Sequence, residues 1–100
     1  MLLKLGANIT NLCPELREKL YEIDRVFHLF TDREAVITSG NDGQHMQNSL
    51  HYADRAIDLR TWFIPTKTRK LLVNELKDRL GKNFDVVDEG NHIHIEYDPK

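Results

Sequence analysis

The sequence is poor in the residues that mark several common classes of protein. It contains one cysteine, Cys13, which can form no intrachain disulfide and has no second thiol with which to hold a metal. The longest apolar runs are short, such as VFHLF at 26–30, so we expect no transmembrane helix. The first residues lack the apolar core and the cleavage site of a signal peptide. We therefore interpret Cys13 as structural and expect the chain to be cytoplasmic as synthesised.

Charge of one sign is not concentrated in any part of the chain. The sequence has 14 Lys and Arg against 16 Asp and Glu, with a formal net charge of −2 and both signs interspersed. A nucleic-acid-binding surface usually needs a basic stripe, so we expect no nucleic-acid partner. With 100 residues, 40% of them hydrophobic, the chain is predicted to be a monomer with a single domain over 1–100.

Two stretches have the periodicity of amphipathic helices. The first covers 11–30, where Pro14 suits the first helical turn. Its apolar residues step by four, three and four positions: Leu16, Leu20, Ile23 and Phe27. The second covers 66–81, where leucines recur every four residues and Gly81 provides a stop signal.

Short, partly alternating segments separate and follow these helices. We predict strands at 34–40, 55–63, 84–87 and 92–97, the last two joined by the turn DEGN. The polar, turn-rich segment 40–54 is predicted to be a long loop, and such a loop in a small domain is usually functional. The order of the elements predicts an α+β fold with a small, mainly antiparallel sheet and two helices.

The strand HIHIEY carries the first candidate site. His92 and His94 are two positions apart, so they project from one face of a strand, while Ile93 and Ile95 project from the other face toward the core. Both histidines can reach one metal ion, or one can bind the ion while the other acts beside it. Alternatively, they are a pair of histidines that face the solvent.

His51 and Asp58 form the second candidate group. Seven positions separate them, so a single straight strand would not direct both to one point. A break between loop and strand near Asp54 lets His51 fold back toward Asp58. Two histidines and a carboxylate are a recurrent catalytic zinc set, with water in the fourth position. The alternatives are an ion pair of Asp58 with Arg55 or Arg60 and a His51 without a function.

The two groups together match a known pattern. S-x-H-x-x-x-x-A-x-D ends at Asp58, and E-x-x-H-x-H ends at His94. This combination resembles the zinc D-Ala-D-Ala peptidases, which include cell-wall carboxypeptidases and dipeptidases, phage peptidoglycan endopeptidases and the related zinc fold of hedgehog signalling domains. The resemblance runs from about Val36 to the end of the chain. It implies a hedgehog- or D,D-peptidase-like zinc fold for the whole chain.

The resemblance also implies roles for individual residues. Zn²⁺ would be bound by His51, Asp58 and His94, whereas family members with E-x-x-H alone would place His92 on the ion. Glu89 takes the position of the general base, and His92 would lie beside the bound water and the scissile carbonyl. On a straight strand Glu89 would face away from both histidines, since its separation from each is odd, so the turn at Gly90 would have to redirect it.

The sequence departs from the family pattern at two places. Asp54 stands where a glycine commonly follows the first histidine by three positions. The family's substrate-binding arginine after Ser-Gly is also absent, and Gln44 or His45 would have to replace it.

The implied function is hydrolysis of a peptide bond in peptidoglycan stem or cross-link peptides, which contain D-amino acids. Such a protein would be of phage or bacterial origin and would act at the cell wall after release. Tyr52, Trp62 and Tyr97 would line the cleft or belong to the core. The main alternative is a zinc-stabilised binding or structural module without catalytic activity, which would not need Glu89. A small α+β domain without a metal is the third interpretation.

Overall fold

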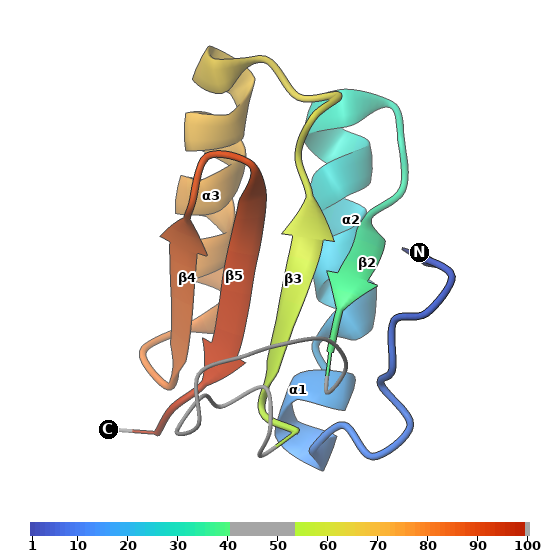
Figure 1. Cartoon of the computed structure of the whole chain (residues 1–100). Helices are drawn as coiled ribbons and strands as arrows, with labels where there is room; N and C mark the ends of the chain where they lie inside the picture. The colour runs from blue at the N-terminus through green and yellow to red at the C-terminus, as the bar shows by residue number, and fades with distance from the viewer. Residues whose placement is uncertain (41–53, 100) are drawn as a thin grey trace.

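The computed structural model describes residues 1–40 and 54–99, which form one sheet and three helical segments (Figure 1). The strands are β1 (Leu2–Leu3), β2 (Val36–Ser39), β3 (Ala56–Arg60), β4 (Phe84–Asp88) and β5 (His92–Tyr97). The helices are α1 (Pro14–Arg17), α2 (Leu20–Thr31) and α3 (Thr66–Leu80).

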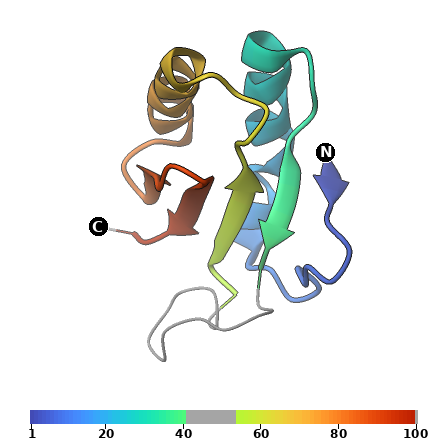
Figure 2. The same ribbon diagram turned by 45° about the horizontal axis from the view of Figure 1, so that its top comes forward.

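The sheet has the strand order β1-β2-β3-β5-β4. Only β1 and β2 pair in parallel, and the other three pairings are antiparallel. The predicted α+β class with a mainly antiparallel sheet is therefore confirmed. The sequence did not predict β1, which lies at the edge beyond β2 (Figure 2), because a strand of two residues has no alternation to detect.

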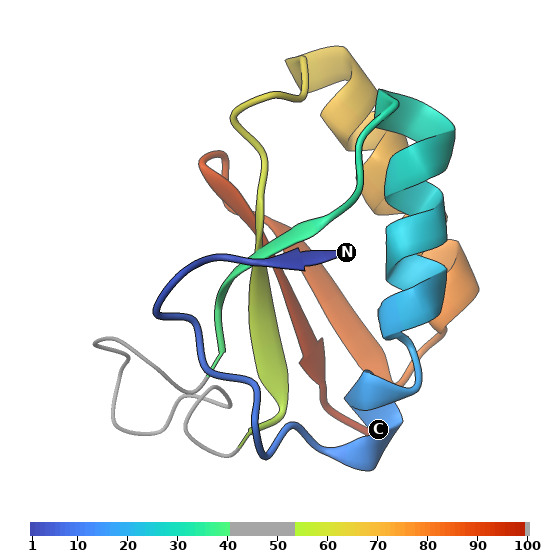
Figure 3. The same ribbon diagram turned by 90° about the vertical axis from the view of Figure 1, so that its right-hand side faces the viewer.

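Helices α2 and α3 cover one face of the sheet, and the opposite face carries no helix among the described residues (Figure 3). The core fills the space between these helices and the sheet, where burial of apolar side chains supplies most of the stabilisation. Its fully buried members include Ile23 and Phe27 of α2, Leu72 and Leu76 of α3, Ile57 and Leu59 of β3, and Ile93 and Ile95 of β5.

The single helix predicted over 11–30 is divided in two. The Lys19 N–H bonds to the carbonyl of Leu16 only three residues back, which interrupts the α-helical pattern between α1 and α2. Leu16 is nevertheless fully buried, as are Ile23 and Phe27, so the predicted apolar stripe is correct. Helix α2 ends at Thr31, and Asp32 follows it with a left-handed φ of 59°.

Strand alternation determines which side chains lie on the helix-free face. In β3, Ile57 and Leu59 enter the core, so Asp58 and Arg60 project from the opposite face. The same alternation in β5 places His92, His94 and Glu96 on that face. These five residues belong to two neighbouring, hydrogen-bonded strands. The helix-free face is therefore where the candidate site forms.

Candidate metal centre

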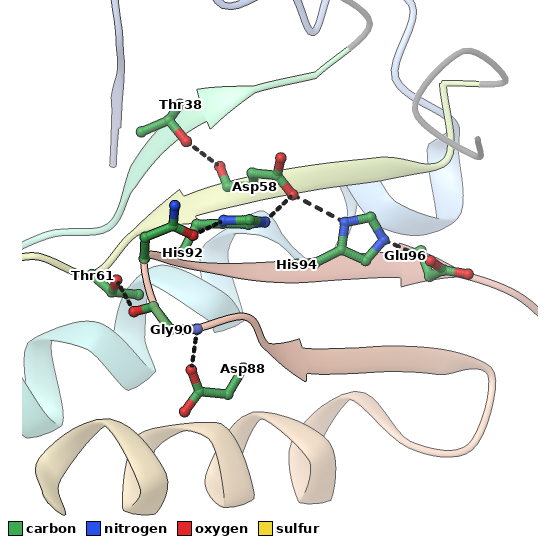
Figure 4. Close-up of polar contacts among 9 residues, drawn as sticks. Thr38, Asp58, Thr61, Asp88, Gly90, His92, His94 and Glu96 are labelled. Carbon is green, nitrogen blue, oxygen red and sulfur yellow. Dashed lines mark hydrogen bonds and ion pairs between the residues drawn. The ribbon is translucent and has the colours of Figure 1, made fainter. Parts of the chain in front are cut away.

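Asp58 and His94 are direct partners across the β3–β5 pairing. The Asp58 Oδ1 and His94 Nδ1 atoms lie 3.0 Å apart, and both side chains are about five-sixths buried (Figure 4). Thr38 of β2 donates its hydroxyl to the Asp58 backbone carbonyl at 3.4 Å, which ties the third strand to this position. Two residues that are 36 positions apart in the sequence are thus brought into contact by the register of the sheet.

His92 joins the same group from the next position on that face of β5. Its Nε2 atom lies 3.8 Å from the same Asp58 Oδ1 atom, and its Nδ1 atom lies 2.6 Å from the Asn91 side-chain oxygen (Figure 4). A ring N–H at Nδ1 is needed for donation to Asn91. In the neutral ring the unprotonated Nε2 therefore faces the carboxylate of Asp58.

The imidazole of His94 lies between two carboxylates. Its second nitrogen, Nε2, is 2.6 Å from Glu96 Oε1. The hydrogen bond with Asp58 raises the pKa of His94 most, burial lowers it, and the hydrogen bond with Glu96 raises it, so that the pKa lies above its ordinary value. In the protonated ring both nitrogens donate, one to each carboxylate.

When the imidazole of His94 is neutral, two hydrogen-bond acceptors face each other. If Nε2–H of His94 donates to Glu96, then Nδ1 has no proton and faces Asp58 Oδ1, which is also an acceptor. Two acceptor atoms at 3.0 Å repel each other unless a proton or a metal ion lies between them. A proton gives an ionised His–carboxylate network, and a metal ion gives a binding site.

The donor atoms of Asp58, His92 and His94 are of the types that zinc takes, and Asp58 lies at ligand spacing from each histidine separately. The three ligand atoms do not all lie within 4.8 Å of one another, a spacing that Asp85, Glu96 and Asp98 alone meet within residues 1–40 and 54–99. Two ligands bound at about 2.0–2.1 Å to a tetrahedral ion lie about 3.3 Å apart. The Asp58–His94 and Asp58–His92 separations of 3.0 Å and 3.8 Å fall on either side of this value. Glu96 lies where it can accept the Nε2–H of His94 while Nδ1 binds a metal ion. Such a hydrogen bond to a metal-binding histidine fixes the tautomer and the orientation of the ring.

The structure brings together part of the predicted ligand set. Asp58 and His94 meet, and His92 lies beside them, so the choice between His92 and His94 as ligand stays open. His51 lies outside the described residues, as do Gln44, His45 and Tyr52. The predicted zinc set of His51, Asp58 and His94 therefore stays a prediction.

Glu89 lies opposite His92 across the β4–β5 hairpin. Its N–H donates to the His92 carbonyl at 2.9 Å, which continues the register of Val87 with His94 and Asp88 with Ile93. Parity along a straight strand therefore does not apply to Glu89, because the turn at Gly90 redirects the chain, as expected from the sequence. Cross-strand partners share a face of the sheet, so Glu89 and His92 belong to the same face. The Glu89 side chain is exposed.

Four hydrogen bonds hold the turn that carries Glu89. The buried Thr61 hydroxyl donates to the Gly90 carbonyl at 3.1 Å, and the Gly90 N–H donates to Asp88 Oδ1 at 2.9 Å (Figure 4). Arg69 of α3 donates from Nε to both oxygens of Asp88, at 2.9 and 3.0 Å. Gly90 has φ of 89°, a conformation that favours glycine. The turn is thus attached both to β3 and to α3.

The alternative ion pairs of Asp58 do not form. Arg55 lies over the ring of Tyr97 at 5.9 Å, and Arg60 lies over the ring of Trp62 at 5.4 Å. No ion pair joins Asp58 to either of these arginines in the described part of the chain. Tyr97 packs against Phe84 and the core, while Trp62 is exposed.

The sequence reasoning overlooked Glu96, although its position contained the signal. Glu96 is two residues after His94 in HIHIEY, so strand alternation places it on the face of the histidines. Glu96 also belongs to a group with Asp85 and Asp98, whose carboxylate oxygens lie within 4.8 Å of one another. Such all-oxygen groups suit hard cations rather than zinc, and exposed acidic groups are common without any ion.

Asp54 accounts for one departure from the family pattern. It adopts a left-handed φ of 59° directly before β3. Aspartate tolerates this region better than most residues with a side chain, although glycine suits it best. Asp54 therefore adopts the left-handed conformation at the position where the resembling peptidases commonly carry a glycine.

Comparison with known proteins adds no relative. No protein-family model matches the sequence, and no curated protein matches it. Over residues 1–40 and 54–99, none of the helices has the length and apolar character needed to cross a membrane. The likeness to the zinc D-Ala-D-Ala peptidases therefore rests on the two motifs themselves.

Proposed function

We propose that the chain is a zinc-dependent peptidase that hydrolyses a peptide bond in D-amino-acid-containing peptidoglycan peptides. The observation that carries this proposal is the convergence of His94 Nδ1 and His92 Nε2 on one oxygen of Asp58, at 3.0 and 3.8 Å. These residues come from the two motifs that resemble the zinc peptidases, and they are the nitrogen and oxygen donors that zinc takes in catalytic sites.

In the proposed reaction, Asp58, His94 and His51 would hold the ion. Bound zinc would lower the pKa of a water molecule toward about 7 and polarise the scissile carbonyl. Glu89 would accept a proton from the water and deliver it to the leaving amine. His92 would donate a hydrogen bond to the carbonyl oxygen as negative charge develops there. Glu96 would keep the ring of His94 oriented through the bond to Nε2.

The rival function is a zinc-stabilised binding or structural module. It needs the same metal ligands, because the ion would then support folding alone. It does not need Glu89, whose exposed carboxylate would be an ordinary turn residue. Glu89 therefore separates the two functions.

The test is the Glu89→Gln variant, which keeps the size of the side chain but cannot accept a proton at neutral pH. We expect normal folding and zinc content, with a fall of about 10²–10⁴ in cleavage of a D-amino-acid-containing wall peptide. Glu18→Gln, an exposed glutamate beside α1, serves as the matched control and should cleave like the wild type.

Two results would contradict parts of the proposal. Undiminished cleavage by Glu89→Gln would assign the base to another residue, with His92 as the first to be tested. A zinc-loaded wild type that cleaves no wall peptide would favour the binding module.

A further inference from the structure

Strand β4 forms an outer edge of the sheet, because β5 is its only neighbour in the strand order of the described chain (Figure 1). The Glu89 N–H bonds to the carbonyl of its partner His92. Antiparallel pairs alternate between hydrogen-bonded and non-hydrogen-bonded residues, so the odd-numbered residues of β4 bond toward β5. The backbone N–H and C=O groups of Val86 and Asp88 therefore point away from the sheet.

Strand β4 has few of the features that protect sheet edges from the addition of another strand. It has five residues, contains no proline or lysine, and pairs with β5 without a shift in register. Strand β1, at the opposite edge, has only two residues. A groove of about 690 Å³ is lined both by β4 and by the C-terminal end of α3. The edge of β4 thus offers an extended chain both backbone partners and space.

The helix-free side of this edge is acidic. Phe84 and Val86 are buried against the helices, so strand alternation places Asp85 on the helix-free face. Carboxylate oxygens of Asp85, Glu96 and Asp98 lie within 4.8 Å of one another. Opposite charges on directly opposed residues of neighbouring strands stabilise a sheet. A lysine or arginine opposite Asp85 would therefore favour strand addition.

The other side of the edge has a different charge. The groove is lined there by Lys77 and Asp78 of α3 and by Lys82, which follows the helix. In an added strand, every second side chain would point to this side. Uncharged side chains suit these positions, because a further basic residue would meet the two lysines. The edge is thus matched to a segment in which basic or apolar residues alternate with uncharged polar ones.

A second copy of the chain fits this edge poorly. Antiparallel self-pairing about Val86 would set Asp85 diagonally across from Asp85 of the second copy, on the same face of the joined sheet. The carboxylates of both copies would then gather on that face. Like charges at neighbouring positions of paired strands destabilise the pairing. The charge of the edge therefore favours a different chain.

We propose that the outer edge of β4 binds an extended segment of a partner protein, which adds an antiparallel strand and places a lysine or arginine opposite Asp85. Backbone hydrogen bonds with Val86 and Asp88 would supply affinity, and the basic residue would supply specificity. This docking site is independent of the proposed peptidase, because it uses none of the candidate zinc ligands.

The probe is the peptide acetyl-Thr-Val-Thr-Lys-Thr-amide, added to the isotope-labelled full chain. In antiparallel pairing its central threonine lies opposite Val86 and its lysine opposite Asp85. We expect saturable shifts of the Val86 and Asp88 amide signals in nuclear magnetic resonance. Hydrogen exchange of these two amides should slow about tenfold at saturation. The Val87 amide, which bonds toward β5, should exchange slowly with and without the peptide.

Matched peptides and variants separate the two contributions. N-methylation of the central threonine removes the donor for the Val86 carbonyl and should weaken binding about tenfold. Glutamate in place of the lysine should weaken it about fivefold. Asp85→Asn should weaken binding of the lysine peptide about threefold and leave binding of a glutamine version unchanged. Asp32→Asn, an exposed site after α2 that does not line the groove, should bind like the wild type.

Three results would overturn the proposal. The first is the absence of any shift of the Val86 and Asp88 signals, or equal binding of the N-methylated peptide, which would refute strand addition. The second is equal binding of the lysine and glutamate peptides, which would refute a basic partner. The third is protection of the Val86 amide that increases with protein concentration in the absence of peptide, which would show that a second copy occupies the edge.

Discussion

At the scale of single residues, the chemistry of the candidate site depends on whether Nδ1 of His94 carries a proton or binds zinc. With a proton there, the ring is an imidazolium held between Asp58 and Glu96. With zinc there, the proton must leave, so zinc and protons compete for the same nitrogen. Because the pKa of His94 is raised, this competition extends above the pH at which an ordinary histidine is neutral.

The competition predicts opposite pH trends with and without zinc. In chelator, the raised pKa means that stabilisation by His94 is fully present below its unfolded pKa of about 6.5 and is lost as the pH rises through the folded pKa. The difference in free energy of unfolding between the wild type and His94→Gln should therefore shrink from pH 6 to pH 9. Denaturant unfolding at several pH values measures it.

Zinc should reverse the trend, since its affinity rises as the proton is lost. In chelator, the wild type could instead exceed His94→Gln in free energy of unfolding by an amount that stays constant or grows with pH. That result would contradict the proton-bridged form of His94.

The sequence predicted much of this residue pattern because the alternation of HIHIEY separates core from surface. Ile93 and Ile95 are fully buried, and both histidines lie on the opposite face, as expected. The contact of His94 with Asp58 depends on the register between β3 and β5, which no local pattern specifies. The identification of that pair came from the motif resemblance rather than from periodicity.

At the scale of elements, the β4–β5 turn is fixed by contacts from two other elements. Partial burial raises the pKa of Asp88. The hydrogen bonds from Arg69 and from the Gly90 N–H lower it by more, so the pKa lies below its ordinary value. The turn places Glu89 opposite His92. The parity argument holds only for a straight strand, and the predicted turn at Gly90 removes it.

The lowered pKa predicts how the attachment of the turn depends on pH. Asp88→Asn should reduce the free energy of unfolding at pH 7 by about 1 kcal/mol, the upper range for a partly exposed ion pair. The loss should be present above the unfolded pKa of about 3.9 and should disappear as the pH falls through the folded pKa.

Denaturant unfolding from pH 7 to pH 2 measures this loss, with Asp78→Asn on the exposed side of α3 as control. The control should change stability by less than about 0.5 kcal/mol. A destabilisation by Asp88→Asn that persists unchanged at pH 2 would show that the ion pair does not hold the turn.

At the scale of the whole molecule, the fold separates a face of the sheet that helices cover from a face that carries the candidate site. Helices α2 and α3 cover one face of the sheet (Figure 3). Strand alternation places Asp58, His92 and His94 on the other face. The sequence predicted the α+β class because the long elements have clear periodicities. It did not predict β1, since a strand of two residues has no alternation to detect.

A domain of 100 residues buries a modest core, so a bound ion would add noticeably to its stability. Ligand binding to the folded state alone contributes about 2.7 kcal/mol at a hundredfold excess over Kd. Zinc should therefore raise the melting temperature of the wild type.

Zinc content per chain tests the central claim most directly. After reconstitution and desalting, elemental analysis should find one zinc per wild-type chain, none in His94→Ala, and one in His92→Ala with lost activity. Retention of zinc by His94→Ala and its loss from His92→Ala would move the ligand to His92 and correct the assignment. A wild-type protein that keeps no zinc after reconstitution would contradict the metal centre itself, and with it the proposed peptidase.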